Sequence, residues 1–282
     1  MTREFCDLHT HSSFSDGSDS PKELIDKAEK IGLYAIALSD HNTVSGLPEF
    51  CEYARGKSVK AIPSVEFSTD FGETEMHIIA HGVAPIHYEN VTEYVSLLAK
   101  RKTKANEELA KSLCDAGYKV DYDRILKNSN GIVNRVHFAS ALIEGGYASG
   151  IDEAFSGILS EERGFYKKVR RLGAVETIEF IKSIGAVATL AHPYLNLNDE
   201  ELRRFLDIAK PLGLDAIETY YSTYTEAEHK SAQRAARDYL LLESGGSDYH
   251  GTQKPNILLG RGKGELFIPS EIAEKILSMV SK

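Results

Sequence analysis

Residues 5–18 of the chain read FCDLHTHSSFSDGS. The stretch opens as a buried strand with His9 and His11 two residues apart, so both imidazoles project from the same face. Two such rings can bind one metal ion. The Ser-Asp-Gly turn that follows places Asp16 just beyond the strand, where its carboxylate can reach the same cavity. The stretch therefore predicts a metal site at the end of the first strand.

Six further apolar segments have the length and composition of strands. Together with the first, the seven are residues 5–11, 33–41, 60–68, 76–82, 186–193, 215–222 and 240–248. Helical patterns lie between most of them, and the first such helix has Ser20 as its N-cap and ends at Gly32. Alternating strands and helices predict parallel strands, and a closed sheet of them is a barrel resembling the (β/α)₈ type.

The alternation stops between about residues 96 and 172, where the pattern is mostly helical. We predict that residues 96–172 form an inserted helical subdomain covering the active site, and that residues 1–95 and 173–282 form the barrel. A run of ordinary exterior barrel helices is the alternative. A chain of 282 residues, 42% of them hydrophobic, is long enough for one large α/β domain with such an insertion.

The charge is unevenly distributed. The formal net charge is −9, but residues 96–171 hold 14 Lys and Arg against 10 Asp and Glu, a net of +4, so the remainder carries −13. Some of the acids outside the insertion are expected to surround cations. The modest positive charge of the insertion suits a small polyanion and is too weak for tight binding of duplex DNA.

Cysteine usage and hydropathy predict a cytoplasmic protein. Cys6, Cys51 and Cys114 lie far apart with no CxxC spacing, which fits a reducing compartment and argues against a disulfide scaffold or a thiolate zinc site. The first residues lack the apolar run of a signal peptide, and no stretch is long and apolar enough to span a bilayer. We expect no association with membranes.

Other polar residues follow the apolar runs of the remaining strands. Asp40 and His41, Glu66, His192, and Asp248 with His250 stand at or near predicted strand ends. In a parallel barrel these ends carry the catalytic groups. His77 and His81 occupy one face of a single strand, so either could be a ligand. Nitrogen and oxygen ligands without sulfur suit Zn²⁺, Mn²⁺, Fe²⁺ or Co²⁺. Nine side chains are too many for one ion and suit two or three: His9, His11, Asp16, His41, Glu66, His77, His192, Asp248 and His250.

The motifs DLHTHSSFSDG, SDHNT, the strand-end Glu66, AHP and the late SDYH resemble the PHP family, named for polymerase and histidinol phosphatase domains. The resemblance covers residues 5–82 and 186–251. It implies a distorted (β/α)₇ TIM-like barrel, the PHP fold, which agrees with the seven predicted strands. It also implies a trinuclear metal site.

Carried over by position, the resemblance implies three metal positions. The first would be held by His9, His11, Glu66 and Asp248; the second by Glu66, His77 and His192; the third by Asp16, His41 and His250. Two or three divalent ions are therefore expected, with zinc, manganese or iron as candidates. The roles of His81 and Asp40 stay open, as does the oligomeric state.

Within the insertion, Arg135 and His137 resemble the Arg-x-His element of a PHP branch that acts on nucleotides and short RNA. A planar guanidinium matches phosphate oxygens, so the resemblance implies that Arg135 binds substrate phosphate and His137 lines the same pocket. His137 is also a candidate catalytic acid for the leaving group. A surface salt bridge is the alternative role of Arg135. Asn196 is a further candidate for substrate binding at the mouth.

The resemblance implies a metal-dependent phosphoesterase that hydrolyses a phosphate ester of a small nucleotide by attack of a metal-bound hydroxide. Nucleoside 3′,5′-bisphosphates, nucleoside monophosphates and short 5′-phosphorylated RNA are the expected substrates. Histidinol phosphate or another small phosphomonoester is the alternative. Two other classes stay open: an amidohydrolase-type hydrolase, which also opens with HxH and ends with an Asp, and a non-catalytic metal-binding module.

Overall fold

The computed structural model describes residues 4–128, 133–167, 169 and 171–280. The chain divides into two compact units, one of residues 1–95 and 171–282 and one of residues 96–170. Helix α3 (Tyr88–Asp115) contributes residues to both units. That the second unit covers the active site stays a prediction.

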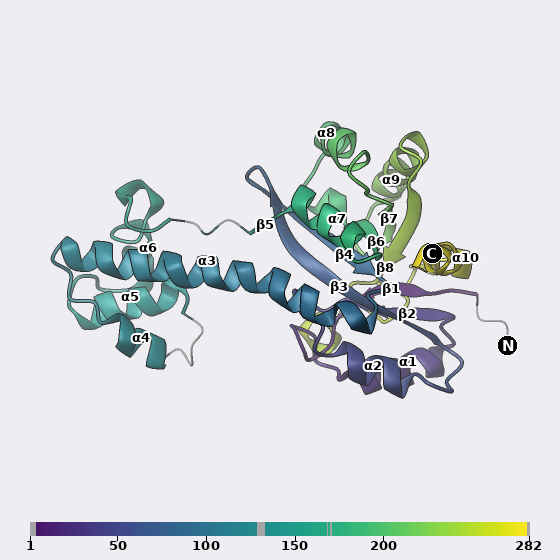
Figure 1. The fold of residues 1–282 in the computed structure, drawn as a ribbon, viewed down its shortest axis with the longest axis horizontal. Helices are drawn as coiled ribbons and strands as arrows, with labels where there is room; N and C mark the ends of the chain where they lie inside the picture. The colour runs from purple at the N-terminus through teal and green to yellow at the C-terminus, as the bar shows by residue number, and fades with distance from the viewer. Residues whose placement is uncertain (1–3, 129–132, 168, 170, 281–282) are drawn as a thin grey trace. The chain divides into compact units, whose positions relative to one another are not determined.

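The first unit is built on a nearly closed barrel of seven strands, as the sequence predicted (Figure 1). In order of pairing the strands are β1 (Asp7–Thr10), β2 (Ala35–Leu38), β3 (Lys60–Phe71), β4 (Thr74–His81), β6 (Val187–Ala191), β7 (Ala216–Tyr221) and β8 (Leu242–Gly246). A two-residue strand, β5 (Leu172–Gly173), pairs with β3 outside this path. A bridge between Thr10 and Tyr249 links the two edges of the sheet.

Glycine permits the close approach of the first and last strands. A Cβ added at Gly246 would lie 2.1 Å from the Cβ of His9. Any side chain at this position would therefore push β8 away from β1 at the level of His9.

One strand departs from the parallel arrangement that the sequence predicted. Strand β4 runs antiparallel to both β3 and β6, because only Gly72 and Glu73 separate β3 from β4 and so short a connection makes a hairpin. Strand β3 also continues to Phe71, so Glu66 lies inside the strand and not at its end. The antiparallel direction brings the amino end of β4 to the mouth where the parallel strands end.

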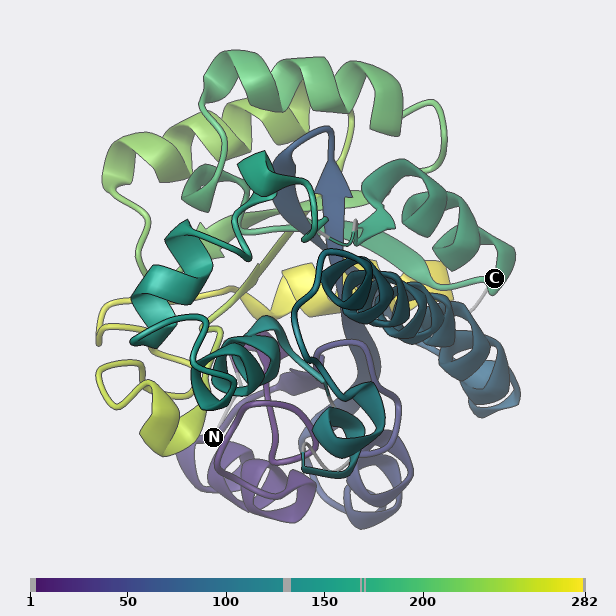
Figure 2. The same ribbon diagram turned by 90° about the vertical axis from the view of Figure 1, so that its left-hand side faces the viewer.

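Helices cover the outside of the barrel. They are α1 (Pro21–Ile31), α2 (Leu47–Tyr53), α7 (Ala174–Ser183), α8 (Asp199–Ala209), α9 (Glu226–Asp238) and α10 (Ser270–Val280), with 3₁₀ turns at Pro85–His87, Pro193–Leu195 and Gly251–Gln253. In Figures 1 and 2 the purple α1 and α2 and the green α8 and α9 lie on opposite sides of the strands. The predicted caps of α1 are present, with Ser20 and Glu23 in a capping box and Gly32 in the left-handed conformation.

Helix α10 closes the end of the barrel at which the parallel strands begin. Its Ile272, Ala273 and Ile276 belong to one apolar cluster with Ala35, Val187 and Ala216, the first residues of β2, β6 and β7. Burying these side chains stabilises that end by roughly 1.5–3 kcal/mol for each large residue. The opposite mouth is left for polar side chains.

The second unit is helical and has its own core. Besides part of α3 it contains α4 (Tyr122–Asn128), α5 (Arg135–Glu144), α6 (Ile151–Ser156) and a 3₁₀ turn at Glu161–Arg163. Leu113, Phe138 and Leu142 are fully buried members of that core. The unit therefore has packing of its own to hold its helices in place.

Among the described residues, no helix combines the length and apolarity that crossing a bilayer requires. The three cysteines are free: Cys6 is buried, Cys51 is partly buried and Cys114 is exposed. Cytoplasmic localisation stays a prediction.

Candidate metal centre

The structure brings all nine predicted metal ligands to one mouth of the barrel. They form four overlapping groups, in each of which the potential ligand atoms lie within 4.8 Å of one another. The groups are His9, His11 and Asp248; His9, Glu66 and His192; His41, Glu66 and His77; and His11, Asp16, His41 and His250. Which of them bind ions stays a prediction.

Glu66 lies at the centre of the cluster. Its Oε2 lies 3.1 Å from His9 Nε2 and 3.1 Å from His41 Nδ1. Its Oε1 lies 2.8 Å from His77 Nδ1 and 3.0 Å from His192 Nε2. Burial raises the pKa of Glu66, but the surrounding imidazoles, His9 first among them, outweigh burial and hold that pKa well below its usual value. One ionised carboxylate therefore joins imidazoles from four different segments.

The first and last strands supply the second part of the cluster. His9 Nε2 and His11 Nε2 are 3.1 Å apart, and Asp248 Oδ1 lies 3.2 Å from His11 Nε2. Burial lowers the pKa of His11, but the adjacent carboxylates of Asp248 and Glu66 outweigh burial and raise the pKa to about 9. These distances bring imidazole nitrogens and carboxylate oxygens close enough to share a cation.

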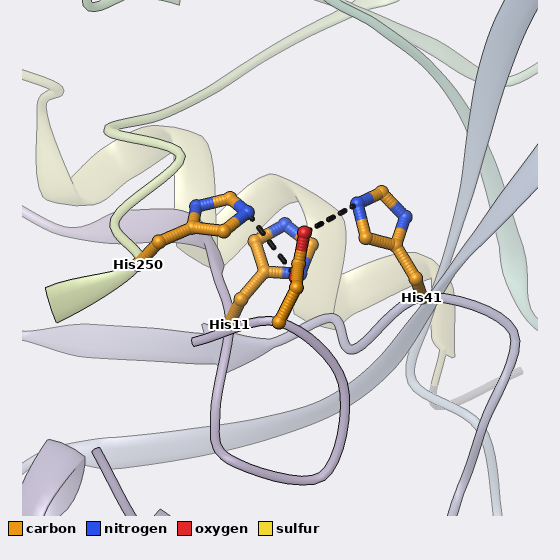
Figure 3. A group of neighbouring side chains, drawn as sticks. His11, His41 and His250 are labelled. Carbon is orange, nitrogen blue, oxygen red and sulfur yellow. Dashed lines mark ion pairs between the residues drawn. The ribbon is translucent and has the colours of Figure 1, made fainter. Parts of the chain in front are cut away.

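Asp16 joins three further imidazoles near the rim. Its carboxylate lies 3.3 Å from His250 Nε2, and 3.7 Å from both His11 Nδ1 and His41 Nε2. Figure 3 shows the rings of His11, His41 and His250 lying close together. The side chain of Asp16 is 54% exposed, so this corner of the cluster faces solvent.

The four groups overlap the three positions that the resemblance implied, and those positions stay a prediction. His192 groups with His9 as well as with Glu66, and His41 groups with Glu66 and His77 as well as with Asp16. The reason is that Glu66 lies between the strands and offers one oxygen to each side of the cluster. The carboxylate of Glu66 can therefore serve two neighbouring metal positions, one through each oxygen, whereas a ring nitrogen with one lone pair can serve only one.

The donor set fits divalent cations. Among the described residues, no hydrogen bond of good geometry reaches the buried atoms His11 Nδ1, His41 Nδ1 and Glu66 Oε2, although charged groups lie close to them. An unpartnered buried polar atom costs roughly 1–3 kcal/mol, and a cation would satisfy such atoms. Imidazole and carboxylate ligands without thiolate suit zinc, manganese and iron.

Asp40, whose role the sequence left open, anchors the loop that carries Asp16. Its Oδ1 accepts hydrogen bonds from Ser12 N at 2.8 Å and Ser15 Oγ at 2.6 Å, and its Oδ2 accepts from Ser12 Oγ at 2.6 Å. Asp40 is buried and belongs to none of the four groups. Its contacts therefore indicate a role in holding the loop.

We expect Asp40→Ala to weaken the rim of the cluster and leave its centre intact. The change removes the acceptor of three hydrogen bonds from one loop, so Asp16 is no longer held in place. We expect each protein molecule to bind about one metal ion fewer than the wild type. Metal counting by mass spectrometry on dialysed protein measures this. Asp26→Ala, a surface change at a carboxylate that binds Tyr53 and Lys57, is the control.

His81 lies away from the cluster. Its Nδ1 is 3.0 Å from Ser64 Oγ, and burial lowers its pKa to about 3. Because β4 runs antiparallel, His77 near the start of the strand reaches the mouth and His81 at its end does not. Strand direction therefore decides between two histidines that share one face.

The predicted substrate residues lie in both units. In the second unit, the guanidinium of Arg135 lies over the rings of Phe155 and Tyr166, 4.4 and 4.5 Å from their centres, and Nη2 donates to Phe155 O. His137 Nδ1 accepts the backbone N–H of Asn134 at the start of α5. In the first unit, Asn196 Nδ2 donates to Glu75 O. Phosphate binding by these residues stays a prediction.

Three residues that contact the cluster were not predicted from the sequence. Glu218 on β7 is fully buried beside His9. Tyr221 Oη and Lys254 Nζ each donate to Asp248 Oδ2 at 2.8 Å. Glu218 had a signal in its sequence, since it is an acid inside an otherwise apolar strand, as Glu66 is. Nothing in the spacing of Tyr221 or Lys254 pointed to a contact with Asp248.

The PHP domain model matches residues 7–172. The chain belongs to the PHP family. It is 31% identical over 251 residues to a 5′-3′ exoribonuclease of Haemophilus influenzae, covering 89% of this chain and 91% of the relative. It is 29% identical to a phosphoribosyl 1,2-cyclic phosphate 1,2-diphosphodiesterase of Eggerthella lenta, and the match covers 87% of this chain and 94% of that relative. It is 27% identical to a 3′,5′-nucleoside bisphosphate phosphatase of Chromobacterium violaceum, and the match covers 86% of each protein.

Two solved structures are similar to this chain. A structure from Bifidobacterium adolescentis, assigned as a metal-dependent phosphoesterase, has a TM-score of 0.66 and 25% identity and covers 97% of this chain and 96% of that one. A structure from Chromobacterium violaceum, described as an amidohydrolase, has a TM-score of 0.64, covers 90% and 89%, and at 24% identity shows the fold alone. The family, the barrel and the functional class of metal-dependent phosphoester hydrolase predicted from the sequence are confirmed.

Proposed function

We propose that this PHP phosphoesterase hydrolyses phosphate esters of small nucleotides, with nucleoside 3′,5′-bisphosphates, nucleoside monophosphates and short 5′-phosphorylated RNA as substrates. The observation that carries the proposal is the buried carboxylate of Glu66 shared among imidazoles of several segments, in a chain whose relatives include an exoribonuclease and a bisphosphate phosphatase. Two or three divalent ions, of zinc, manganese or iron, are part of the proposal.

The four groups of ligands would hold these ions. When bound, such ions lower the pKa of a coordinated water and neutralise charge on phosphoryl oxygens. Glu66 would fix the distance between two groups of imidazoles, because its Oε2 contacts His9 on β1 and its Oε1 contacts His77 on β4. Tyr221 and Lys254 would hold Asp248 by one oxygen, which leaves Oδ1 directed at His11.

Arg135 and His137 are the residues we propose for the substrate phosphate and the leaving group. The rings of Phe155 and Tyr166 restrict the guanidinium of Arg135, so less side-chain entropy is lost when it binds an anion. His137 Nδ1 is occupied as an acceptor, so a proton for a leaving group would come from Nε2. Asn196 is proposed to contact substrate at the mouth.

A substrate panel tests the proposal. Purified protein supplied with Mn²⁺ is assayed for phosphate release from nucleoside 3′,5′-bisphosphates and monophosphates, for shortening of 5′-phosphorylated oligoribonucleotides, and for opening of a ribose cyclic phosphate. Histidinol phosphate and an amide or lactone set complete the panel. We expect the highest kcat/KM on a nucleotide substrate. Exclusive turnover of histidinol phosphate, or amide turnover alone, would contradict the proposal.

We expect Arg135→Ala to lower kcat/KM on the preferred nucleotide about 10- to 100-fold, the equivalent of one charge-assisted hydrogen bond to phosphate. Arg124→Ala is the matched control, because Arg124 lies in the same unit and pairs with Glu144 on the surface. Thermal unfolding of each variant separates loss of binding from loss of the aromatic packing around Arg135. Equal kcat/KM for the wild type and a folded Arg135→Ala variant would remove this residue from the site.

A further inference from the structure

Glu218 is a fully buried carboxylate in β7 whose two oxygens contact groups on two other segments. Its Oε1 lies 2.9 Å from His9 Nδ1, and its Oε2 accepts the backbone N–H of His192 at 2.7 Å. It belongs to none of the four groups of potential ligands. It nevertheless contacts His9 and His192, which together with Glu66 form one of those groups.

The first contact sets the ring of His9. A carboxylate only accepts hydrogen bonds, so Nδ1 of His9 carries a proton, and in the neutral ring the lone pair is then on Nε2. That Nε2 lies 3.1 Å from Glu66 Oε2 and 3.1 Å from His11 Nε2, so its lone pair points into the cluster. Carboxylates bonded to the far nitrogen of a ligating imidazole fix its tautomer and raise its basicity.

The second contact sets the backbone of His192. This residue has φ 27° and ψ 54°, in the left-handed region that side-chain-bearing residues seldom adopt. Such a conformation costs about 1–3 kcal/mol and persists when neighbouring groups hold it. The bond from His192 N to Glu218 holds the turn from which the imidazole reaches Glu66 Oε1, 3.0 Å away.

We propose that Glu218 is a positioning residue that aligns His9 and His192 for one metal ion. This inference rests on the metal centre of the proposed function. One carboxylate sets the tautomer of His9 in β1 and the backbone of His192, which directly follows β6, and these two strands are not neighbours in the sheet. Glu218 would act on the metal through the two histidines and not as a ligand.

Glu218→Gln tests this role. Glutamine keeps the shape but has one acceptor oxygen, so it can satisfy only one of the two donors and turns its NH₂ toward the other. We expect the Kd for Zn²⁺ at one position to rise about 10- to 100-fold, measured by competition with a chelator in the absence of substrate. Circular dichroism and thermal unfolding of the metal-free protein show whether the fold is retained.

Glu243→Gln is the matched control. Glu243 lies on the neighbouring strand β8, where its Oε2 accepts from Thr219 Oγ1 at 2.8 Å and Gln233 Nε2 at 3.2 Å. We expect its Zn²⁺ affinity to stay within twofold of the wild type. Glu218→Asp, which withdraws both oxygens by one methylene but keeps the charge, carries the test if the Gln variant does not fold.

The outcomes separate this inference from the proposed function. Weaker Zn²⁺ binding in a folded Glu218 variant, with normal binding by the Glu243 control, supports the positioning role. Wild-type Kd and zinc number in a folded Glu218 variant would overturn it and leave the proposed function standing. A wild-type protein that binds no Zn²⁺, Mn²⁺ or Fe²⁺ would overturn both.

Discussion

Removal of metal should abolish hydrolysis of the preferred phosphate ester, and adding back Mn²⁺ or Zn²⁺ should restore it. We expect a fall of at least about 10³-fold in kcat/KM, or about 4 kcal/mol of transition-state stabilisation, because the cluster offers imidazoles and carboxylates suited to metal ions and a metal-activated water needs no Ser or Cys nucleophile. Phosphate release after dialysis against chelator, with metal content verified by mass spectrometry, measures the effect.

Stability provides an independent readout of the same removal. Metal that binds only the folded protein raises the free energy of unfolding by about 2.7 kcal/mol at a concentration of 100 times its Kd. The Tm should therefore rise with added Mn²⁺ or Zn²⁺ and should not respond to added K⁺. Full activity in protein shown to be free of metal would refute the mechanism.

The second large effect is expected for Glu66→Gln. The substitution keeps the volume of the side chain but removes the charge that faces His9, His41, His77 and His192. Because Glu66 belongs to two of the four groups of potential ligands, its loss should impair two neighbouring metal positions together. We expect kcat/KM to fall at least about 10³-fold and the number of bound ions to decrease.

Glu226→Gln is the control for this variant. Glu226 is exposed on α9, where it pairs with Lys230 four residues on, so its loss should change stability by no more than about 0.5 kcal/mol and leave the number of bound ions unchanged. The reading of Glu66 would be wrong if the folded Glu66→Gln variant kept the full complement of metal.

Much of the fold was predictable because local pattern and tertiary structure agree in it. The seven apolar segments all contain strands of the barrel, and the capping residues of α1 hold the positions that their types predicted. The direction of β4 was predicted wrongly. Alternation of strands and helices suggests parallel strands, and this expectation overlooked the two-residue hairpin at Gly72 and Glu73.

The candidate site shows the same division. Its ligand types were visible in the sequence because histidines and acids at the ends of apolar strands are costly unless something binds them. Three residues were not predicted because their importance lies in contacts with ligands distant along the chain. Glu218 contacts His9, 209 residues away, and Asp248 is contacted by Tyr221, 27 residues away, and by Lys254, 6 residues away. Such contacts exist only once the barrel closes.

The sequence by itself determined that imidazoles and carboxylates would gather at one mouth of a barrel, since parallel strands align their carboxyl ends whatever their order in the sheet. Only the tertiary structure decided that His77 reaches the cluster and His81 does not, because that choice depends on the antiparallel direction of β4. The tertiary structure also decided that Glu66 serves both sides of the cluster and that Glu218 supports His9 and His192. Each of these depends on distances across the closed barrel, which residue spacing along the chain does not specify.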